Sequence, residues 1–276
     1  MCIRDSIYSA LIRTGASSRR IRHFADCGSA LWLYRDGTQL SLCCNKCHDR
    51  LCLPCQRERQ AAVVEGIGLR MADTTKTTRF VTLTLKHSES TLSLQIDRLL
   101  ASFKLLRSHP DVKQRMTGGV WFLEVKLDKQ RHLWHPHLHV IVEGEFIHKR
   151  ELAKAWFSVT GDSFIVDIRA IDAPGERINY VAKYATKPLH NEVTLQTAKL
   201  DEFVLAIKGR RLYQCFGTWS RAVDRTKPPK RKIERIASMS TLHADALAGD
   251  ISALVLLLQS HAKWPRLAHA FPLPLG

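Results

Sequence analysis

The chain has 276 residues, 45% of them hydrophobic, which is enough for one substantial core with a small appended module. This composition excludes a disordered or collagen-like chain. Lysine and arginine number 42 against 26 acidic residues, and the net charge of +16 draws the protein to polyanions, of which nucleic acid is the commonest. Charge alone also allows a ribosome-associated or merely basic soluble protein.

The sequence also bears on the compartment of the protein. Residues 1–14 lack the apolar core of a signal peptide, and the longest apolar run, Ala253–Leu258, is far too short to cross a bilayer. We therefore expect a soluble protein of the cytoplasm with no membrane partner. Eight cysteines in a reducing compartment indicate metal binding more than disulfides.

The first distinctive element is a cysteine-rich stretch over residues 27–55. Two pairs of the C-x2-C type predict a structural zinc site with four thiolate ligands: Cys44, Cys47, Cys52 and Cys55. Because the gap between the pairs is short, Cys27, Cys43 or His48 can replace one member. An iron–sulfur cluster and unliganded thiols are the alternatives. Nearby arginines suit contacts with a phosphate backbone: Arg50, Arg57 and Arg59.

Strands and helices follow in alternation. Period-2 alternation of apolar residues predicts strands over 79–86, 120–126, 135–142 and 164–171, with one more over 210–219. Helical spacing predicts helices over 92–106, 149–159, 176–186 and 246–258. Gly118-Gly119 breaks the chain, and Thr226–Lys232 is a basic, proline-broken loop or tail. The pattern predicts an α+β fold whose sheet is covered by helices on one side.

The strand over 135–142 carries three histidines at period 2. Residues i and i+2 of a strand point to one face, so His135, His137 and His139 project together. His137 and His139 can bind one divalent cation. Glu124 fits as a third ligand, because it lies on the face of the preceding strand opposite Trp121, Leu123 and Val125. His135 ranks below them because Pro136 restricts its backbone. Two imidazoles and a carboxylate are typical of an open catalytic metal site, and the alternative is surface histidines on an edge strand.

The helix over 176–186 carries two tyrosines and neighbouring lysines. At about 100° per residue, four side chains fall together on the polar side of the helix: Tyr180, Lys183, Tyr184 and Lys187. The ammonium groups would favour the phenolate form of a tyrosine and hold a phosphate. An ordinary amphipathic helix with two snorkelling tyrosines is the alternative.

Together these segments resemble the HUH endonucleases, named for His–hydrophobic–His, here His137–His139. Phe80–Thr84 resembles the first motif of rolling-circle replication initiators, His135–His139 the second, and Tyr180–Tyr184 the third. The tyrosines follow the histidines, as in replication initiators and some transposases, whereas in conjugative relaxases they precede them. The cysteine module resembles that of plasmid Rep initiators. Many of those have an acidic residue where this chain has Tyr180, which instead resembles the two-tyrosine initiators of single-stranded DNA phages.

The resemblance implies a central antiparallel sheet, the HUH or ferredoxin-like palm, and a metal-dependent nickase and ligase. It implies that Tyr184 attacks the scissile phosphate of single-stranded or cruciform origin DNA, leaving a 5′-phosphotyrosine link and a free 3′-hydroxyl. Lys183 would contact the transferring phosphate, and Tyr180 would perform a second cleavage. The expected metals are Mn²⁺ or Mg²⁺ at the histidines and Zn²⁺ in the cysteine module.

The resemblance further implies a bacterial protein, encoded by a plasmid or phage, that works with a host helicase and polymerase. Side chains expected on the DNA backbone are Lys187, Arg50 and Arg57. Three other functions compete with this one: a single-strand transposase, a non-catalytic zinc-dependent DNA-binding protein, and a hydrolase that uses the histidines alone. The expected segments are an extension (1–26), a zinc module (27–71), a catalytic domain (79–222), and a basic linker with a C-terminal helix (223–276).

Overall fold

The computed structural model describes residues 3–74, 76–128, 130–171, 193, 196–220 and 233–273. The chain forms two compact units: unit 1 comprises Met1–Ala16 and Leu53–Arg225, and unit 2 comprises Ser17–Cys52 and Thr226–Gly276. Both contain an antiparallel sheet covered by helices, which confirms the predicted α+β class. In the described part of the chain, no helix is long and apolar enough to cross a membrane.

Unit 1 is built on a five-stranded antiparallel sheet with the order β6-β3-β5-β4-β7. Its strands are β3 (Thr78–Thr84), β4 (Gly118–Leu127), β5 (Trp134–Glu143), β6 (Val166–Ala170) and β7 (Tyr213–Gly217). Each predicted strand is present, with its ends shifted by a few residues. The strand with the three histidines, β5, lies at the centre of the sheet.

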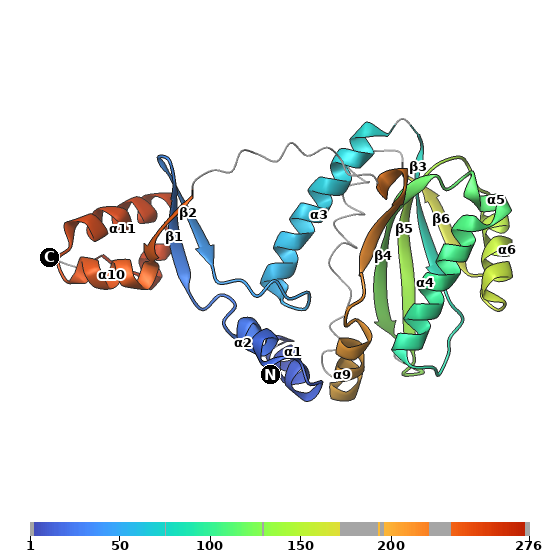
Figure 1. The fold of residues 1–276 in the computed structure, drawn as a ribbon, viewed down its shortest axis with the longest axis horizontal. Coiled ribbons are helices and arrows are strands. Elements are labelled where there is room, and N and C mark those ends of the chain that lie inside the picture. Colours follow the sequence, from blue (N-terminus) through green and yellow to red (C-terminus); the bar gives the residue numbers. More distant parts are fainter. Residues whose placement is uncertain are drawn as a thin grey trace. The chain divides into compact units, whose positions relative to one another are not determined.

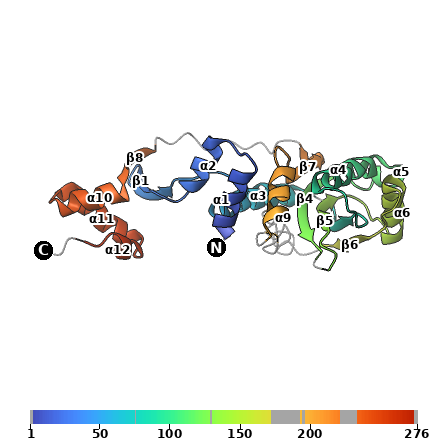
Figure 2. The same cartoon turned by 90° about the horizontal axis from the view of Figure 1, so that it is seen from below.

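Helices pack on both faces of this sheet, so the expectation of a one-sided cover is wrong (Figure 1). The helices of unit 1 are α1 (Ile3–Arg13), α3 (Leu53–Asp73), α4 (Leu92–Ser108), α5 (Pro110–Lys113), α6 (Lys149–Thr160), α9 (Thr197–Ala206) and the short 3-10 helix η1 (Thr218–Ser220). On one face α4 lies against β5, with α5 and α6 beside it (Figure 2). On the other, α3 packs Val63, Ile67 and Met71 onto Phe80 and Ile141. This apolar stripe, four residues apart on α3, is what covers the second face.

Two glycines predicted to break the chain are instead the first residues of β4, where the backbones approach closely. Gly119 has a φ of +154°, and a Cβ there would lie 2.1 Å from the carbonyl oxygen of Ile141 on β5. We expect Gly119→Ala to lower the free energy of unfolding by about 2 kcal/mol or more, because the central strands must separate.

Thermal unfolding tests this prediction, with Gly68→Ala as the control. Gly68 lies within α3, and a Cβ there would meet no atom within 4 Å. That substitution should raise stability by about 0.5–1 kcal/mol, since alanine favours a helix interior over glycine. Equal midpoints for the two variants would contradict the packing described for β4.

Unit 2 contains a three-stranded antiparallel sheet with the order β2-β1-β8. Its elements are α2 (Ser18–Ala25), β1 (Leu31–Asp36), β2 (Gln39–Cys44), β8 (Glu234–Ser238), α10 (Met239–Leu247), α11 (Ile251–Lys263) and α12 (Leu267–Ala270). Because β8 pairs with β1, the C-terminal segment completes a sheet that begins in the predicted cysteine module. The compact units therefore group these residues differently from the four expected segments. Leu33, Leu242 and Leu257 join the sheet to the helices in one core.

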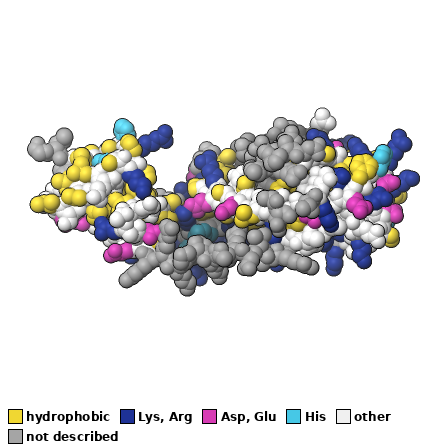
Figure 3. All heavy atoms as spheres, turned by 90° about the horizontal axis from the view of Figure 1, so that it is seen from above, with side chains coloured by type: hydrophobic (Ala, Val, Ile, Leu, Met, Phe, Trp, Pro, Cys, Tyr) yellow, Lys and Arg dark blue, Asp and Glu magenta, His cyan; other side chains and the backbone are white. Residues whose placement is uncertain are grey.

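The predicted C-terminal helix is two helices. The chain turns at Gly249, whose φ is +92°, and the Asp250 side chain accepts hydrogen bonds from the first backbone amides of α11. On α11, Ile251, Val255 and Leu258 are exposed, while the core receives Ala253 and Leu257, among others. Figure 3 shows hydrophobic side chains on the surface of this unit. The predicted helix over 176–186 and the basic segment 226–232 lie outside the described residues.

Candidate active site and cysteine cluster

The predicted histidine face lies at the middle of the five-stranded sheet. β5 is flanked by β3 and β4, which excludes the alternative of histidines on an edge strand. Across one ladder, His137 is the register partner of Glu124. Across the other, Thr84 is opposite His137 and Thr82 is opposite His139. Register partners point to the same face, so the sheet gathers the predicted imidazoles, the carboxylate and two hydroxyls.

Hydrogen bonds fix the imidazole of His139 at both nitrogens. Its Nε2 lies 2.7 Å from Glu124 Oε2, and its Nδ1 lies 3.2 Å from Thr82 Oγ1. The Lys126 ammonium lies 3.2 Å from the same Glu124 oxygen. His139 and Glu124 are both buried, so the hydrogen bond between them is strengthened and fixes the position of both side chains.

His137 is held at one nitrogen only. Its Nδ1 lies 3.3 Å from Thr84 Oγ1, whereas its Nε2 is buried and has no hydrogen-bond partner among the described residues. A buried polar atom without a partner is costly and calls for an explanation. Metal-binding histidines characteristically use one nitrogen for the ion and the other for a positioning hydrogen bond. The geometry of His137 fits that arrangement.

Burial sets the protonation of these histidines. It lowers the pKa of His137 to about 3, and the nearby charges of His135 and Lys126 act in the same direction. Burial also lowers the pKa of His135 to about 4. Both imidazoles are therefore neutral near pH 7, which is the form that binds a metal ion.

His135, the lower-ranked ligand, lies in a small cluster of rings. Its ring stacks on His87 with 4.2 Å between centroids and meets the ring of His137 edge-on at the same separation. His87 Nε2 in turn lies 3.9 Å from a carboxylate oxygen of Asp128. Sequence reasoning did not assign a role to His87, Asp128 or Lys126. The alternation of Thr82 and Thr84 with apolar residues was visible, but only strand register reveals that they meet the histidines.

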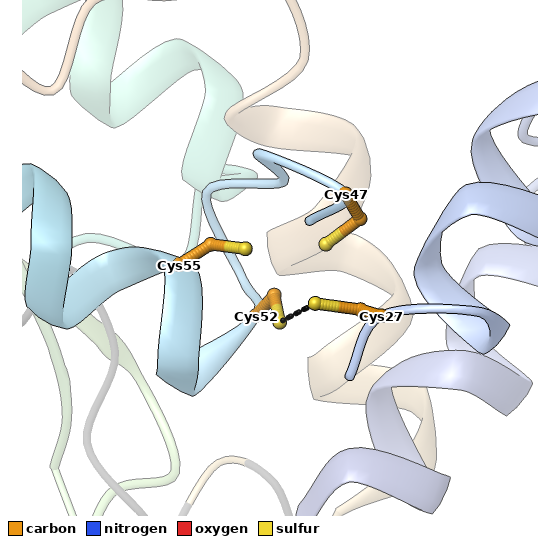
Figure 4. Close-up of side chains that lie close together, drawn as sticks. All are labelled: Cys27, Cys47, Cys52 and Cys55. Atoms are coloured by element: carbon orange, nitrogen blue, oxygen red, sulfur yellow. Dashed lines mark hydrogen bonds between the residues drawn. The ribbon is translucent and has the colours of Figure 1, made fainter. Parts of the chain in front are cut away.

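A second group of potential ligands is the cysteine cluster (Figure 4). Its members are Cys27, in the turn after α2; Cys47, in the loop after β2; Cys52, just before α3; and Cys55, in the first turn of α3. Their sulfurs all lie within 4.8 Å of one another. Tetrahedral zinc with bonds of about 2.3 Å places its sulfurs about 3.8 Å apart, so this donor set fits zinc closely.

The structure brings together three of the four predicted zinc ligands and one of the predicted substitutes, Cys27. Cys44, the last residue of β2, is not in the group, and Cys27 takes its place. Cys52 donates to Cys27 Sγ at 3.5 Å. In the part of the chain described, this is the one group of three or more such ligands whose donor atoms all lie within 4.8 Å of one another. His139 Nε2 and Glu124 Oε2 are 2.7 Å apart, but the donors of His137, His139 and Glu124 do not all meet that limit together.

The loop that carries Cys47 is ordered by Asp49. Arg20 donates to both carboxylate oxygens of Asp49, at 2.6 and 3.3 Å, and the Leu51 amide donates to one of them at 2.9 Å. The Asp49 amide donates to Cys47 Sγ at 3.4 Å. Burial raises the pKa of the Cys47 thiol, and the neighbouring sulfurs of Cys52 and Cys27 raise it further. A bound cation would offset this cost of forming thiolates.

We expect Cys52→Ser to abolish zinc binding and to lower the free energy of unfolding by at least about 3 kcal/mol, because a closed four-thiolate site contributes directly to folding. Cys44→Ser makes the same replacement of sulfur by oxygen at a cysteine outside the cluster, and this variant should keep its full zinc content. Elemental analysis and thermal unfolding of the purified proteins measure both quantities. Loss of zinc from the Cys44 variant, with zinc retained in the Cys52 variant, would contradict the cluster.

The other predicted site residues lie in the tyrosine segment and near the start of α3. The tyrosine helix with its lysines lies outside the described residues: Tyr180, Lys183, Tyr184 and Lys187. Arg50 is partly buried in the turn before α3, and Arg57 is exposed on α3.

Comparisons with known proteins agree on one family. A family model described as a replication protein matches residues 41–246. The chain is 26% identical over 204 residues to a Protein rep of Staphylococcus aureus, an alignment that covers 67% of this chain and 89% of that protein. No solved structure matches significantly. The matched residues span three of the clustered cysteines and all five strands of the unit 1 sheet.

Proposed function

The chain belongs to the replication protein family, and we propose that it starts rolling-circle replication by nicking single-stranded origin DNA through a tyrosine. The observation that carries this proposal is the pairing of His137 and His139 with Glu124 at the centre of the sheet, with His137 Nε2 buried and without a hydrogen-bond partner among the described residues. The family match favours a replication initiator over a transposase that uses the same chemistry.

His137, His139 and Glu124 would hold a divalent cation, with His135 close by. Nitrogen and oxygen donors beside a phosphate substrate suit Mn²⁺ or Mg²⁺. When bound, the cation supplies Lewis-acid stabilisation of the negative charge that develops on the scissile phosphate. Thr82 and Thr84 position the two imidazoles through their Nδ1 atoms, and Lys126 adds a positive charge beside Glu124.

Tyr184 is proposed as the nucleophile, because it occupies the Lys-Tyr position of the third motif. Its phenolic oxygen attacks phosphorus, the bond from phosphorus to the 3′-oxygen breaks, and that oxygen leaves and takes up a proton. The products are a 5′-phosphotyrosine link and a free 3′-hydroxyl that primes synthesis. Because one phosphodiester replaces another, a later attack by a 3′-hydroxyl rejoins the strand without ATP.

The neighbouring residues have supporting roles in the proposal. Lys183 favours the phenolate and contacts the phosphate. Tyr180, four residues earlier in the sequence, performs the second cleavage at the end of a round. Lys187, Arg50 and Arg57 bind the DNA backbone, and the zinc site stabilises the fold around it. We place this activity in the bacterial cytoplasm, on single-stranded or cruciform origin DNA, with a host helicase and polymerase.

The experiment is covalent capture. The purified chain is incubated with Mn²⁺ and a labelled single-stranded DNA library with a randomised core, and the products are separated under denaturing conditions. A metal-dependent protein–DNA adduct is expected, and sequencing the trapped strands identifies the origin. Free nicked product without an adduct would replace the proposal with a hydrolase, and DNA binding without either product would replace it with a non-catalytic binding protein.

A further inference from the structure

The sheet of unit 2 has one face packed against helices and one that carries aromatic side chains. Leu33 is buried against α10 and α11. Trp32 and Tyr34, its neighbours on β1, point to the opposite face because successive residues of a strand alternate. Both are partly exposed. Large aromatic rings at period 2 on the outer face of a small sheet need a reason other than the core.

A cation from the neighbouring strand joins these rings. Arg235 on β8 is the register partner of Tyr34, and its guanidinium lies over the ring of Trp32, 4.5 Å from the centroid. The Trp32 indole donates from Nε1 to Asn45 Oδ1 at 3.0 Å, which fixes the plane of the ring. Arg235 is exposed. The face therefore offers a held indole, a phenol ring and a cation side by side.

The surrounding charge is favourable to a polyanion. The segment that runs directly into Ile233 and β8 is rich in basic residues: Lys227, Lys230, Arg231 and Lys232. Asp36 lies at the hairpin turn, where its negative charge would repel a phosphate. We therefore place the ligand nearer to Trp32.

We propose that Trp32, Tyr34 and Arg235 form a second nucleic-acid surface that holds single-stranded DNA by base stacking. Aromatic side chains and arginine planes in a basic setting bind unpaired bases without sequence preference. Duplex DNA hides its base faces, so this surface distinguishes single strands from duplex. The inference goes beyond the proposed nicking activity and does not depend on it, since it requires neither the histidines nor a tyrosine nucleophile.

The test measures binding of a fluorescent oligothymidylate to the full chain, by anisotropy, without added Mn²⁺ or Mg²⁺ so that no strand is cut. We expect the double variant Tyr34→Ser, Arg235→Gln to bind about tenfold or more weakly. Arg235→Gln alone should also reduce the slope of log affinity against log salt by about one. Tyr34→Phe, which keeps the ring, should bind as the wild type does.

The matched control is Lys263→Gln. Lys263 belongs to the same unit, loses the same charge, and lies over the ring of Trp264 at 5.2 Å on α11. It should change oligothymidylate binding by less than about twofold. Photocrosslinking to an oligonucleotide that contains 5-bromodeoxyuridine, followed by mass spectrometry, should place the crosslink on Trp32 or Tyr34. Equal binding by the double variant and the control, or a crosslink confined to other residues, would overturn the proposal whether or not the chain nicks DNA.

Discussion

Tyr184→Phe is expected to abolish the covalent adduct between the protein and single-stranded DNA, a loss of at least about a thousandfold in the rate of its formation. The substitution removes one oxygen atom, which is the proposed nucleophile, and leaves the ring in place. Binding of uncleaved DNA should therefore be unchanged. The measurement is quantification of the denaturation-resistant band with labelled DNA and Mn²⁺, alongside anisotropy for binding.

Two further tyrosines serve as controls for this result. Tyr213→Phe removes a hydroxyl from β7, outside the proposed motif, and should form adduct at the wild-type rate. Tyr180→Phe should keep the first cleavage and lose the second. An adduct that persists in both single variants and disappears only in the Tyr180, Tyr184 double variant would show that the two tyrosines are interchangeable. An adduct that persists in the double variant would contradict the tyrosine mechanism.

The centre of unit 1 was predictable because two local periodicities coincide there. Alternation along β5 places three histidines on one face, and alternation along β4 places Glu124 on the face opposite Trp121, Leu123 and Val125. Antiparallel pairing of these neighbouring strands then sets Glu124 against His137. The alternation does not reveal which atoms form hydrogen bonds with the imidazole Nδ1 atoms. Those atoms belong to Thr82 and Thr84, which precede their histidine partners by 57 and 53 residues in the chain.

The cysteine cluster and unit 2 were harder to predict, because they also depend on contacts between residues that are far apart in the sequence. Spacing favours Cys44 as a zinc ligand, but β2 holds that residue in a ladder with β1, and the turn after α2 supplies Cys27 instead. The two-residue turn Gly37-Thr38, in which Gly37 has a φ of +59°, is a usable hairpin signal, but no strands were predicted on either side of it. The pairing of β8 with β1 joins Glu234 to Arg35, and such a distant contact leaves no local pattern in the sequence.

The second large effect is expected for His137→Ala, which should reduce metal-dependent adduct formation by at least about a hundredfold while DNA binding is kept. The neutral imidazole has its Nδ1 close to Thr84 and its Nε2 without a hydrogen-bond partner in the described ranges, so its removal takes away the proposed ligand atom. Because His139 contacts Glu124 directly, the other two proposed ligands should stay in place in the variant.

A readout independent of activity separates a metal ligand from a core residue. Mn²⁺ at about a hundred times its dissociation constant should stabilise the wild type by about 2.7 kcal/mol in thermal unfolding, and this increment should be lost in His137→Ala. His269→Ala, at an exposed position on α12, should keep it. If His137 serves only the packing of the sheet, the alanine variant will unfold at a lower temperature with and without Mn²⁺, and the increment due to the ion will be the same as in the wild type. A lost increment with little change in the metal-free protein is the outcome that the unpartnered Nε2 predicts.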